Sequence, residues 1–193
     1  MSEPGNYRPV SFTSYLSKIL EAIIKDDPTV HSLINDSQHG FLAKRSCLTN
    51  LLEFLEYVTK AVDHGKPVDV IYLDFQKAFD KVPHVRLLNK LEAHGISGNV
   101  SQWIAEWLQA RQQRVVLNGS VSNWLHVLSG VSQGSILGPL LFIIFINDID
   151  NGIVNKLLKF SDDAKLVGIV SRPLEVKELQ LDLYTWIFIP TVG

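Results

Sequence analysis

The spacing of apolar residues predicts four helices. Two stripes, over 16–24 and 48–62, repeat every three or four residues, and each follows a serine or threonine suited to cap a helix. Gly65 can stop the second stripe, because glycine adopts the left-handed conformation that ends many helices. Two further segments, 83–95 and 103–108, show the same period and are expected to be the third and fourth helices.

Between the second and third of these helices, residues 68–73 form a β-branched and apolar run. Such a run suits a strand buried on both faces, and it ends in a carboxylate, Asp74. Further along, Asn118-Gly119 separates runs at 114–117 and 124–128. Asn-Gly between two such runs is the strongest short-range signal of a β-hairpin, so two antiparallel strands are expected there.

A second hairpin is predicted farther toward the C-terminus. Residues 157–160 and 165–169 are two apolar runs, and Asp162 and Asp163 fall between them. An apolar helix over 137–149 precedes this hairpin. The pattern therefore places two aspartates at the tip of a β-hairpin.

The composition sets the size of the core and excludes some classes of protein. With 193 residues, 46% of them apolar, the chain can bury the core of one domain or somewhat more, which excludes a disordered tail or a disulfide miniprotein. The 18 Lys+Arg against 20 Asp+Glu give a net charge of -2, so the chain as a whole has no excess of basic residues for binding nucleic acid. Any binding to a phosphate backbone must therefore come from a local patch of basic residues.

The sequence shows no signal for secretion or for a membrane. Its one cysteine, Cys47, cannot form an intramolecular disulfide, and the N-terminus lacks a basic segment followed by an apolar one. The longest apolar run, 139–146, is far shorter than the roughly 20 residues of a membrane helix. We expect an intracellular protein, in the nucleus or the cytoplasm, with no membrane span.

Three aspartates stand where packing alone would not place them. Asp74 directly follows the apolar strand, and Asp162 with Asp163 lies between two apolar runs. Ionised carboxylates are seldom buried unless they are paired or bind a metal, and Mg²⁺ takes carboxylates together with waters and substrate phosphates. The ordinary alternative is a polar turn at 162–163 and a cap at Asp74.

Five segments, taken in order, give the chain a family resemblance. They are Asn6-Tyr7-Arg8-Pro9-Val10-Ser11, Gln38-His39-Gly40-Phe41, the run from Tyr72 to Asp80, the run from Leu128 to Ser135, and Phe160-Ser161-Asp162-Asp163. They resemble the fingers and palm motifs of reverse transcriptases from non-LTR (LINE-type) retrotransposons of the jockey and CR1 kinds. The resemblance runs from near Asn6 to near Trp186, and five ordered motifs make it specific.

The resemblance implies a two-metal polymerase site. Asp74 and Asp162 would hold two Mg²⁺ ions, with Asp163 assisting, the Phe75 carbonyl oxygen as a further ligand, and Mn²⁺ as a substitute ion. In such a site one ion lowers the pKa of the primer 3′-hydroxyl, and the other stabilises the leaving pyrophosphate. The reaction is in-line phosphoryl transfer, which depends on positioning and charge.

The resemblance also implies a pocket for the incoming nucleotide. Gln133 and Gly134 would shape it, and the ring of Phe79 would crowd a ribose 2′-hydroxyl and so favour deoxynucleotides. Arg8 would contact the triphosphate, a task that suits its planar donor fork. Without the motifs, a solvated surface arginine is an equal interpretation of Arg8.

Basic residues at two places are candidates for binding nucleic acid. Lys44 and Arg45 precede a predicted helix and could hold a phosphate near its N-terminus. Arg111 and Arg114 could touch a template backbone, with a solvated helix end as the equal alternative. The partners implied are an RNA template, a DNA primer and dNTPs, with no membrane and the oligomeric state left open.

The sequence departs from the family at several positions. The usual Arg-Lys-Gly-Arg-Ser after Gly-Phe is replaced by Leu42 to Ser46, which lacks one basic residue and a glycine. Ser132 stands for a usual proline, Ser161 for alanine and Ala164 for threonine. None of these changes removes a carboxylate, but losing the proline frees a φ angle and is expected to loosen the nucleotide loop.

The fold expected from the resemblance is α+β, a right-hand polymerase palm whose antiparallel sheet has helices on one face. Partial helical fingers are assigned to 1–66, the palm with the catalytic carboxylates to 67–170, and a divergent tail to 171–193. That tail is expected to begin as a helix and to leave it at 187–190. The chain is expected to be truncated at both ends and to lack a thumb.

The function expected is that of an RNA-directed DNA polymerase domain fragment from a retrotransposon. Two alternatives stay open. One is a catalytically inactive remnant of such an element, which the irregular tail favours somewhat. The other is a different palm-type two-metal nucleotide enzyme, such as a nucleotide cyclase, which would share the acids without needing the Gln133-Gly134 loop.

Overall fold

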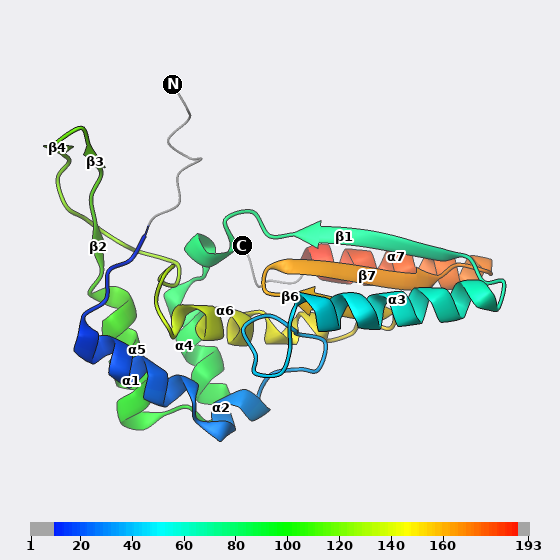
Figure 1. The fold of residues 1–193 in the computed structure, drawn as a ribbon, viewed down its shortest axis with the longest axis horizontal. Coiled ribbons are helices and arrows are strands. Elements are labelled where there is room, and N and C mark those ends of the chain that lie inside the picture. Colours follow the sequence, from blue (N-terminus) through cyan, green and yellow to red (C-terminus); the bar gives the residue numbers. More distant parts are fainter. Residues whose placement is uncertain (1–9, 189–193) are drawn as a thin grey trace. The chain divides into compact units, whose positions relative to one another are not determined.

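The computed structural model describes residues 10–188, which fall into two compact units. Unit 1 comprises Met1–Leu33 and Lys77–Ile144, and unit 2 comprises Ile34–Gln76 and Phe145–Gly193. Figure 1 shows the elements of both units. No helix within the described residues is long and apolar enough to cross a membrane. The division into fingers, palm and tail follows the anatomy of a polymerase and stays a prediction.

Unit 1 consists mainly of helices, of which the periodicity predicts the longer ones but not the two short ones at 28–32 and 78–81. The elements are α1 (Tyr15–Lys25), α2 (Pro28–Ser32), the 3₁₀ helix η2 (Ala78–Lys81), α4 (His84–Ala93), α5 (Gly98–Gln109) and most of α6 (Gly138–Phe145). The Ser14 side chain caps α1 by accepting the Ser17 N–H at 3.1 Å. Pro83 is the N-cap of α4 and lies just outside the helix.

The predicted hairpin at Asn118-Gly119 is confirmed. Both turn residues have positive φ, 48° and 81°, as the tight turns that suit paired strands require. Its ladder is interrupted: β3 (Val116–Leu117) pairs with β4 (Ser120–Val121) next to the turn, and β2 (Gln112–Gln113) pairs with β5 (Leu125–His126) farther away. All eight strand residues are exposed.

The apolar helix α6 is shorter than predicted. It ends at Phe145, and the 3₁₀ helix η3 (Asn147–Asp150) of unit 2 follows. Its start is fixed by Glu21 of α1, whose buried carboxylate accepts the N–H groups of Ile136 at 2.8 Å and Leu137 at 3.2 Å. A carboxylate at a helix N-terminus satisfies donors that have no partner within the helix.

Unit 2 is built on an antiparallel sheet of order β1-β7-β6. The strands are β1 (Val68–Asp74), β6 (Lys156–Phe160) and β7 (Asp163–Ile169). The expectation that β1 is buried on both faces is wrong, because β1 is an edge strand and Tyr72 is 69% exposed. Two-sided burial belongs to central strands, and here that place is taken by β7.

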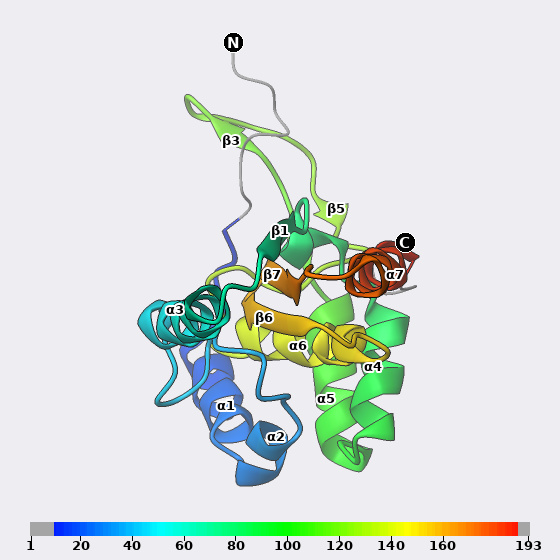
Figure 2. The same ribbon diagram turned by 90° about the vertical axis from the view of Figure 1, so that its right-hand side faces the viewer.

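Helices lie on both faces of this sheet (Figure 2). Lys165 of β7 donates to Asn50 on α3 (Cys47–Asp63), while a Cβ added at Gly168 would come within 2.9 Å of Leu179 on α7 (Pro173–Phe188). Alternate residues of a strand point to opposite faces, so α3 and α7 cover different sides. The α+β class is confirmed, but the expectation that helices cover only one face of the sheet is wrong.

Two expectations about helix faces and ends also need correction. The capping box of Ser46 and Thr49 starts α3 as predicted, yet Leu48 and Leu55 of the apolar stripe are exposed, and Asn50 is buried instead. The tail does not leave its helix at residue 187, because α7 continues to residue 188. The rest of that segment, Ile189 and Pro190, lies outside the described residues.

Candidate active site

The three candidate acids meet at one end of the sheet in unit 2. Asp74, the last residue of β1, is the register partner of Asp163, the first residue of β7. Asp162 and Ser161 form the two-residue turn between β6 and β7. Cross-strand partners have Cβ atoms roughly 4.5–5.5 Å apart and share a sheet face, so Asp74 and Asp163 are direct neighbours.

The acids affect one another electrostatically. The pKa of Asp163 is raised, first by its partial burial and then by the negative charges of Asp162 and Asp74, while Lys165 opposes the shift. Like charges close together disfavour ionisation of each other. A cation at this end of the sheet would relieve the repulsion and favour the ionised forms.

The carboxylates are the type of ligand that a hard divalent cation prefers. Within residues 10–188, no three His, Cys, Asp or Glu side chains are already gathered as a metal-binding group. Asp74 and Asp163 are exposed, and Asp162 is half-buried. Mg²⁺ uses few carboxylates and completes its shell with water and phosphate, so a small number of acids at the end of the sheet is compatible with it.

A segment from the N-terminal part of unit 2 runs beside the hairpin that carries Asp162. The His39 N–H donates to the Lys159 carbonyl at 2.9 Å, and the Lys159 N–H donates to the Ser37 carbonyl at 2.7 Å. Gln38 pairs with Lys159 of β6 as an isolated parallel bridge. The resemblance identifies Gln38-His39-Gly40-Phe41 as a motif, but gives no reason to place it beside the turn that carries Asp162.

The predicted nucleotide loop, 129–135, belongs to unit 1 and is anchored to η2 and the residues around it. Gly130 donates to the Val82 carbonyl and Val131 to the Phe79 carbonyl, both at 2.8 Å. A Cβ added at Gly130, whose φ is 88°, would come within 2.8 Å of the Asp80 backbone. Gln133 donates through Nε2 to Asp80 Oδ1 at 3.1 Å, and the exposed Gly134 also has a positive φ, 91°.

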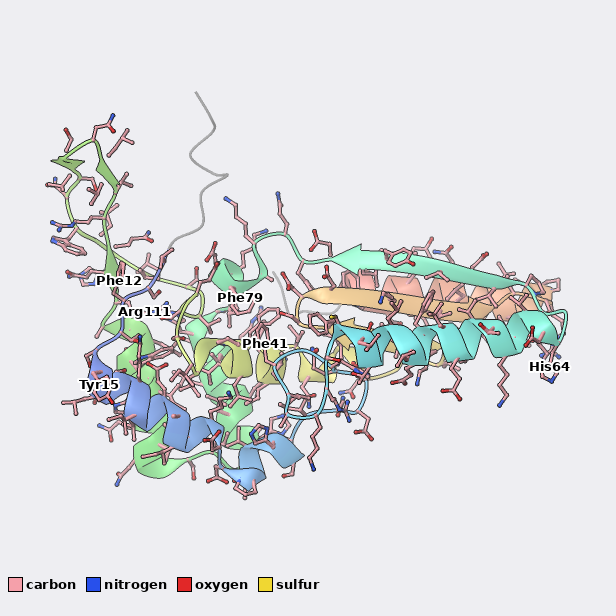
Figure 3. All side chains as sticks on the ribbon, viewed as in Figure 1. Phe12, Tyr15, Phe41, His64, Phe79 and Arg111 are labelled. Carbon is pink, nitrogen blue, oxygen red and sulfur yellow. The ribbon has the colours of Figure 1, made fainter. Side chains whose placement is uncertain are left out.

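Arg111 also binds the same loop. Its Nη1 donates to Ser132 Oγ at 3.0 Å, its Nη2 donates to the Gly130 carbonyl, and its Nε donates to the Leu108 carbonyl at 3.1 Å. Figure 3 shows Arg111 where α5 meets the hairpin. Sequence reasoning assigned Arg111 to the template; its guanidinium is already occupied inside the chain.

The aromatic candidates pack against other rings. Phe79, which Figure 3 labels, is half-buried. Its ring stacks on that of Phe142, with centroids 4.6 Å apart. Phe75 follows Asp74, and its ring lies 5.0 Å from that of Trp186 on α7. The Phe75 ring is thus directed toward α7, while its carbonyl stays a predicted metal ligand.

The remaining basic candidates differ in their surroundings. Arg45 pairs with Asp36 at 2.6 Å and donates to the Gln38 carbonyl at 2.8 Å, whereas Lys44 is exposed. Arg114 is exposed and stacks over Trp124, with its Cζ 4.5 Å from the ring centroid. The fifth basic candidate, Arg8, lies outside the described residues.

The structure therefore brings together part of the predicted site. Asp74, Asp162 and Asp163 gather in unit 2, and Phe79 with the loop of Gln133 gathers in unit 1. The assembly of these two groups into one active site stays a prediction.

Residues 2–180 match the reverse transcriptase (RNA-dependent DNA polymerase) family. The chain belongs to this family. Among curated proteins, it is 29% identical over 171 residues to a probable RNA-directed DNA polymerase from transposon X-element of Drosophila melanogaster, covering 84% of the chain and 19% of that protein. It is 31% identical over 150 residues to the RNA-directed DNA polymerase from mobile element jockey of Drosophila funebris, covering 76% of the chain and 16% of that protein.

A solved structure gives the same fold. This chain matches a structure of apo telomerase from Candida Tropicalis that is truncated from the C-terminal domain. The TM-score is 0.57 and the identity 12%, over 88% of this chain and 35% of the telomerase chain. The likeness supports the α+β fold of a polymerase palm fragment, as the motifs predict. The chain spans less than a quarter of the two curated relatives, at 19% and 16% of their lengths.

Proposed function

We propose that this chain carries the catalytic centre of an RNA-directed DNA polymerase from a non-LTR retrotransposon. The reaction is the transfer of a nucleotide from a dNTP to a primer 3′-hydroxyl, opposite an RNA template. The observation that carries the proposal is the pairing of Asp74 with Asp163, with Asp162 in the adjoining turn, in a chain of the reverse transcriptase family.

The acids would act as the ligands of two Mg²⁺ ions. Asp74 and Asp162 are the principal candidates, with Asp163 and the Phe75 carbonyl assisting. When bound, such ions lower the pKa of the attacking hydroxyl and neutralise charge on the triphosphate. The paired strands contribute by fixing the carboxylates at one sheet end, because in-line transfer depends on positioning more than on covalent chemistry.

The remaining candidates would hold the substrates. Gln133 and Gly134 would line the nucleotide pocket, and Phe79 would select against a 2′-hydroxyl. Lys44 and Arg114 are the exposed cations that could contact template or primer phosphates. Arg8 is proposed to contact the dNTP triphosphate. Arg45 and Arg111 are further candidates for phosphate contact, although Arg45 already pairs with Asp36 and Arg111 already binds the 129–135 loop.

Primer extension on poly(rA)/oligo(dT), with and without Mg²⁺ or Mn²⁺, tests the proposal. Asp74→Asn and Asp162→Asn should each lower extension by more than about 100-fold, beyond the range that follows the loss of an outer metal-site partner. Asp69→Asn is the matched control, because Asp69 is an exposed residue of the same strand, away from the acidic end. Extension that survives both substitutions contradicts the proposed centre, and no extension by the wild type favours the inactive remnant.

A further inference from the structure

The buried side chain of Gln38 faces Ser161, the turn residue that precedes Asp162. Gln38 is 1% exposed. Its Oε1 accepts the Ser161 N–H at 2.9 Å and the Gly40 N–H at 2.7 Å, and its Nε2 donates to the Ser161 carbonyl at 3.3 Å. One amide thus binds both the N–H and the C=O of Ser161, across a separation of 123 residues in the sequence.

Gly40 completes this contact by having no side chain. A Cβ at position 40 would come within 3.0 Å of Ser161 Cα and closer still to its nitrogen. Both groups belong to backbone, which cannot turn aside as a long side chain can. The Gln38-His39-Gly40 segment therefore needs glycine here because of its approach to the turn.

The turn itself needs outside support. Ser161 has a φ of 58°, in the left-handed region, at the first position of a two-residue hairpin turn where glycine is normally preferred. A non-glycine residue persists in such a conformation when its surroundings fix it. The three hydrogen bonds of the Gln38 side chain, two of them to Ser161, provide that restraint.

The restraining segment is itself held in place. Its backbone pairs with β6 through Ser37 and His39, and the Gln38 carbonyl accepts a hydrogen bond from Arg45 Nη1 at 2.8 Å. Asn50 of α3 donates to the Lys159 carbonyl at 3.2 Å, on the strand that leads into the turn. The backbone that carries Gln38 and the strand that leads into the turn are thus both held by hydrogen bonds, so the Gln38 amide has a defined position from which to restrain Ser161.

We infer that Gln38 and Gly40 are positioning residues for Asp162. By fixing the peptide units on both sides of the Ser161 α-carbon, they set the direction in which the chain enters Asp162 and so the direction of its carboxylate. The inference rests on the proposed function insofar as that carboxylate binds a cation. Second-sphere partners that orient a metal ligand typically affect metal affinity or activity by about 10–100-fold.

The test compares Gln38→Asn and Gln38→Met with Gln180→Asn in the 193-residue chain. Gln38→Asn keeps the amide but withdraws it from Ser161, and Gln38→Met removes it at similar size. Gln180→Asn is the control, because Gln180 is exposed on α7. If Gln38→Met does not fold, Gln38→Asn with its smaller change carries the test.

Two readouts separate positioning from simple structural support. In the metal-free chain, ¹⁵N order parameters of Ser161 and Asp162 should fall from about 0.85 to below about 0.6 in the Gln38 variants, with β7 and α7 unchanged. In a Mn²⁺ titration, affinity should fall by about 10-fold or more. Gln180→Asn should change neither.

The outcomes distinguish the inference from the proposed function. Folded Gln38 variants that keep wild-type order at Ser161 and Asp162, or that lose order while Mn²⁺ binds as tightly as before, overturn the inference. If the wild type neither binds Mn²⁺ nor extends a primer, the proposed function fails, and order lost only in the Gln38 variants still supports the positioning.

Discussion

The hydroxyl of Ser161 is buried and has no hydrogen-bond partner in the structure. The N–H and C=O groups of the same residue both form hydrogen bonds with Gln38. The turn is therefore held in place while the Ser161 hydroxyl is left without a hydrogen bond. The family usually has alanine at this position. A buried hydroxyl without a partner costs about 1–3 kcal/mol of desolvation.

Ser161→Ala should therefore raise the free energy of unfolding by about 1 kcal/mol, because it removes the unsatisfied hydroxyl and leaves the backbone contacts intact. Urea unfolding in metal-free buffer measures the change. Ser171→Ala, at an exposed position before α7, is the control and should stay within about 0.5 kcal/mol of the wild type. A lower stability of Ser161→Ala than of this control would show that the hydroxyl has a partner.

At the scale of elements, local signals in the sequence predict which elements form, but not which faces they bury. Ser46 and Thr49 start α3, and Asn118-Gly119 turns the hairpin, because capping and turn chemistry depend on a few neighbouring residues. Whether Leu48 and Tyr72 are buried depends on what packs beside α3 and β1, and the spacing of apolar residues does not specify this; both side chains are exposed.

The candidate site divides in the same way. The motif order predicts that Asp74 and Asp162 meet, and antiparallel pairing of β1 with β7 brings their neighbourhood together. The contacts of Gln38 with Ser161 and of Arg111 with Ser132 join segments far apart in the sequence. Hydrogen bonds of this kind leave no periodic pattern, so a single sequence does not reveal them.

The loop of Gln133 lacks the usual proline, and Arg111 supplies a different restraint. Ser132 is 1% exposed and uses its hydroxyl to accept from Arg111, which proline could not do. Arg111→Lys should raise the KM for dNTP by about 10-fold, because an ammonium cannot replace a guanidinium that spans three acceptors. Steady-state extension at varied dNTP measures it.

The control for that variant is Arg172→Lys, at an exposed position paired with Glu175. It should leave the KM for dNTP unchanged. If Arg111 acts through the loop, affinity for the primer–template should also be unchanged in Arg111→Lys. Weaker binding of the duplex with an unaltered KM for dNTP would instead return Arg111 to the template role that its sequence position suggests.

At the scale of the whole molecule, the net charge of -2 leaves little general attraction for nucleic acid. Two of the four cations predicted to bind it are already engaged: Arg45 with Asp36, and Arg111 with the nucleotide loop. Lys44 and Arg114 are exposed. Binding to a phosphate backbone should therefore depend on few contacts.

The salt dependence of primer–template binding tests this account. Each phosphate contact contributes about 0.9 to the slope of log affinity against log salt on a duplex. Lys44→Ala and Arg114→Ala should each reduce that slope by about 1, because each removes a cation free to displace counterions. Arg45→Ala should change the slope less, because its guanidinium already neutralises Asp36.

Equal reductions of the slope in all three variants would mean that Arg45 leaves Asp36 to bind phosphate. An unchanged slope in Lys44→Ala and Arg114→Ala would place the duplex on another surface.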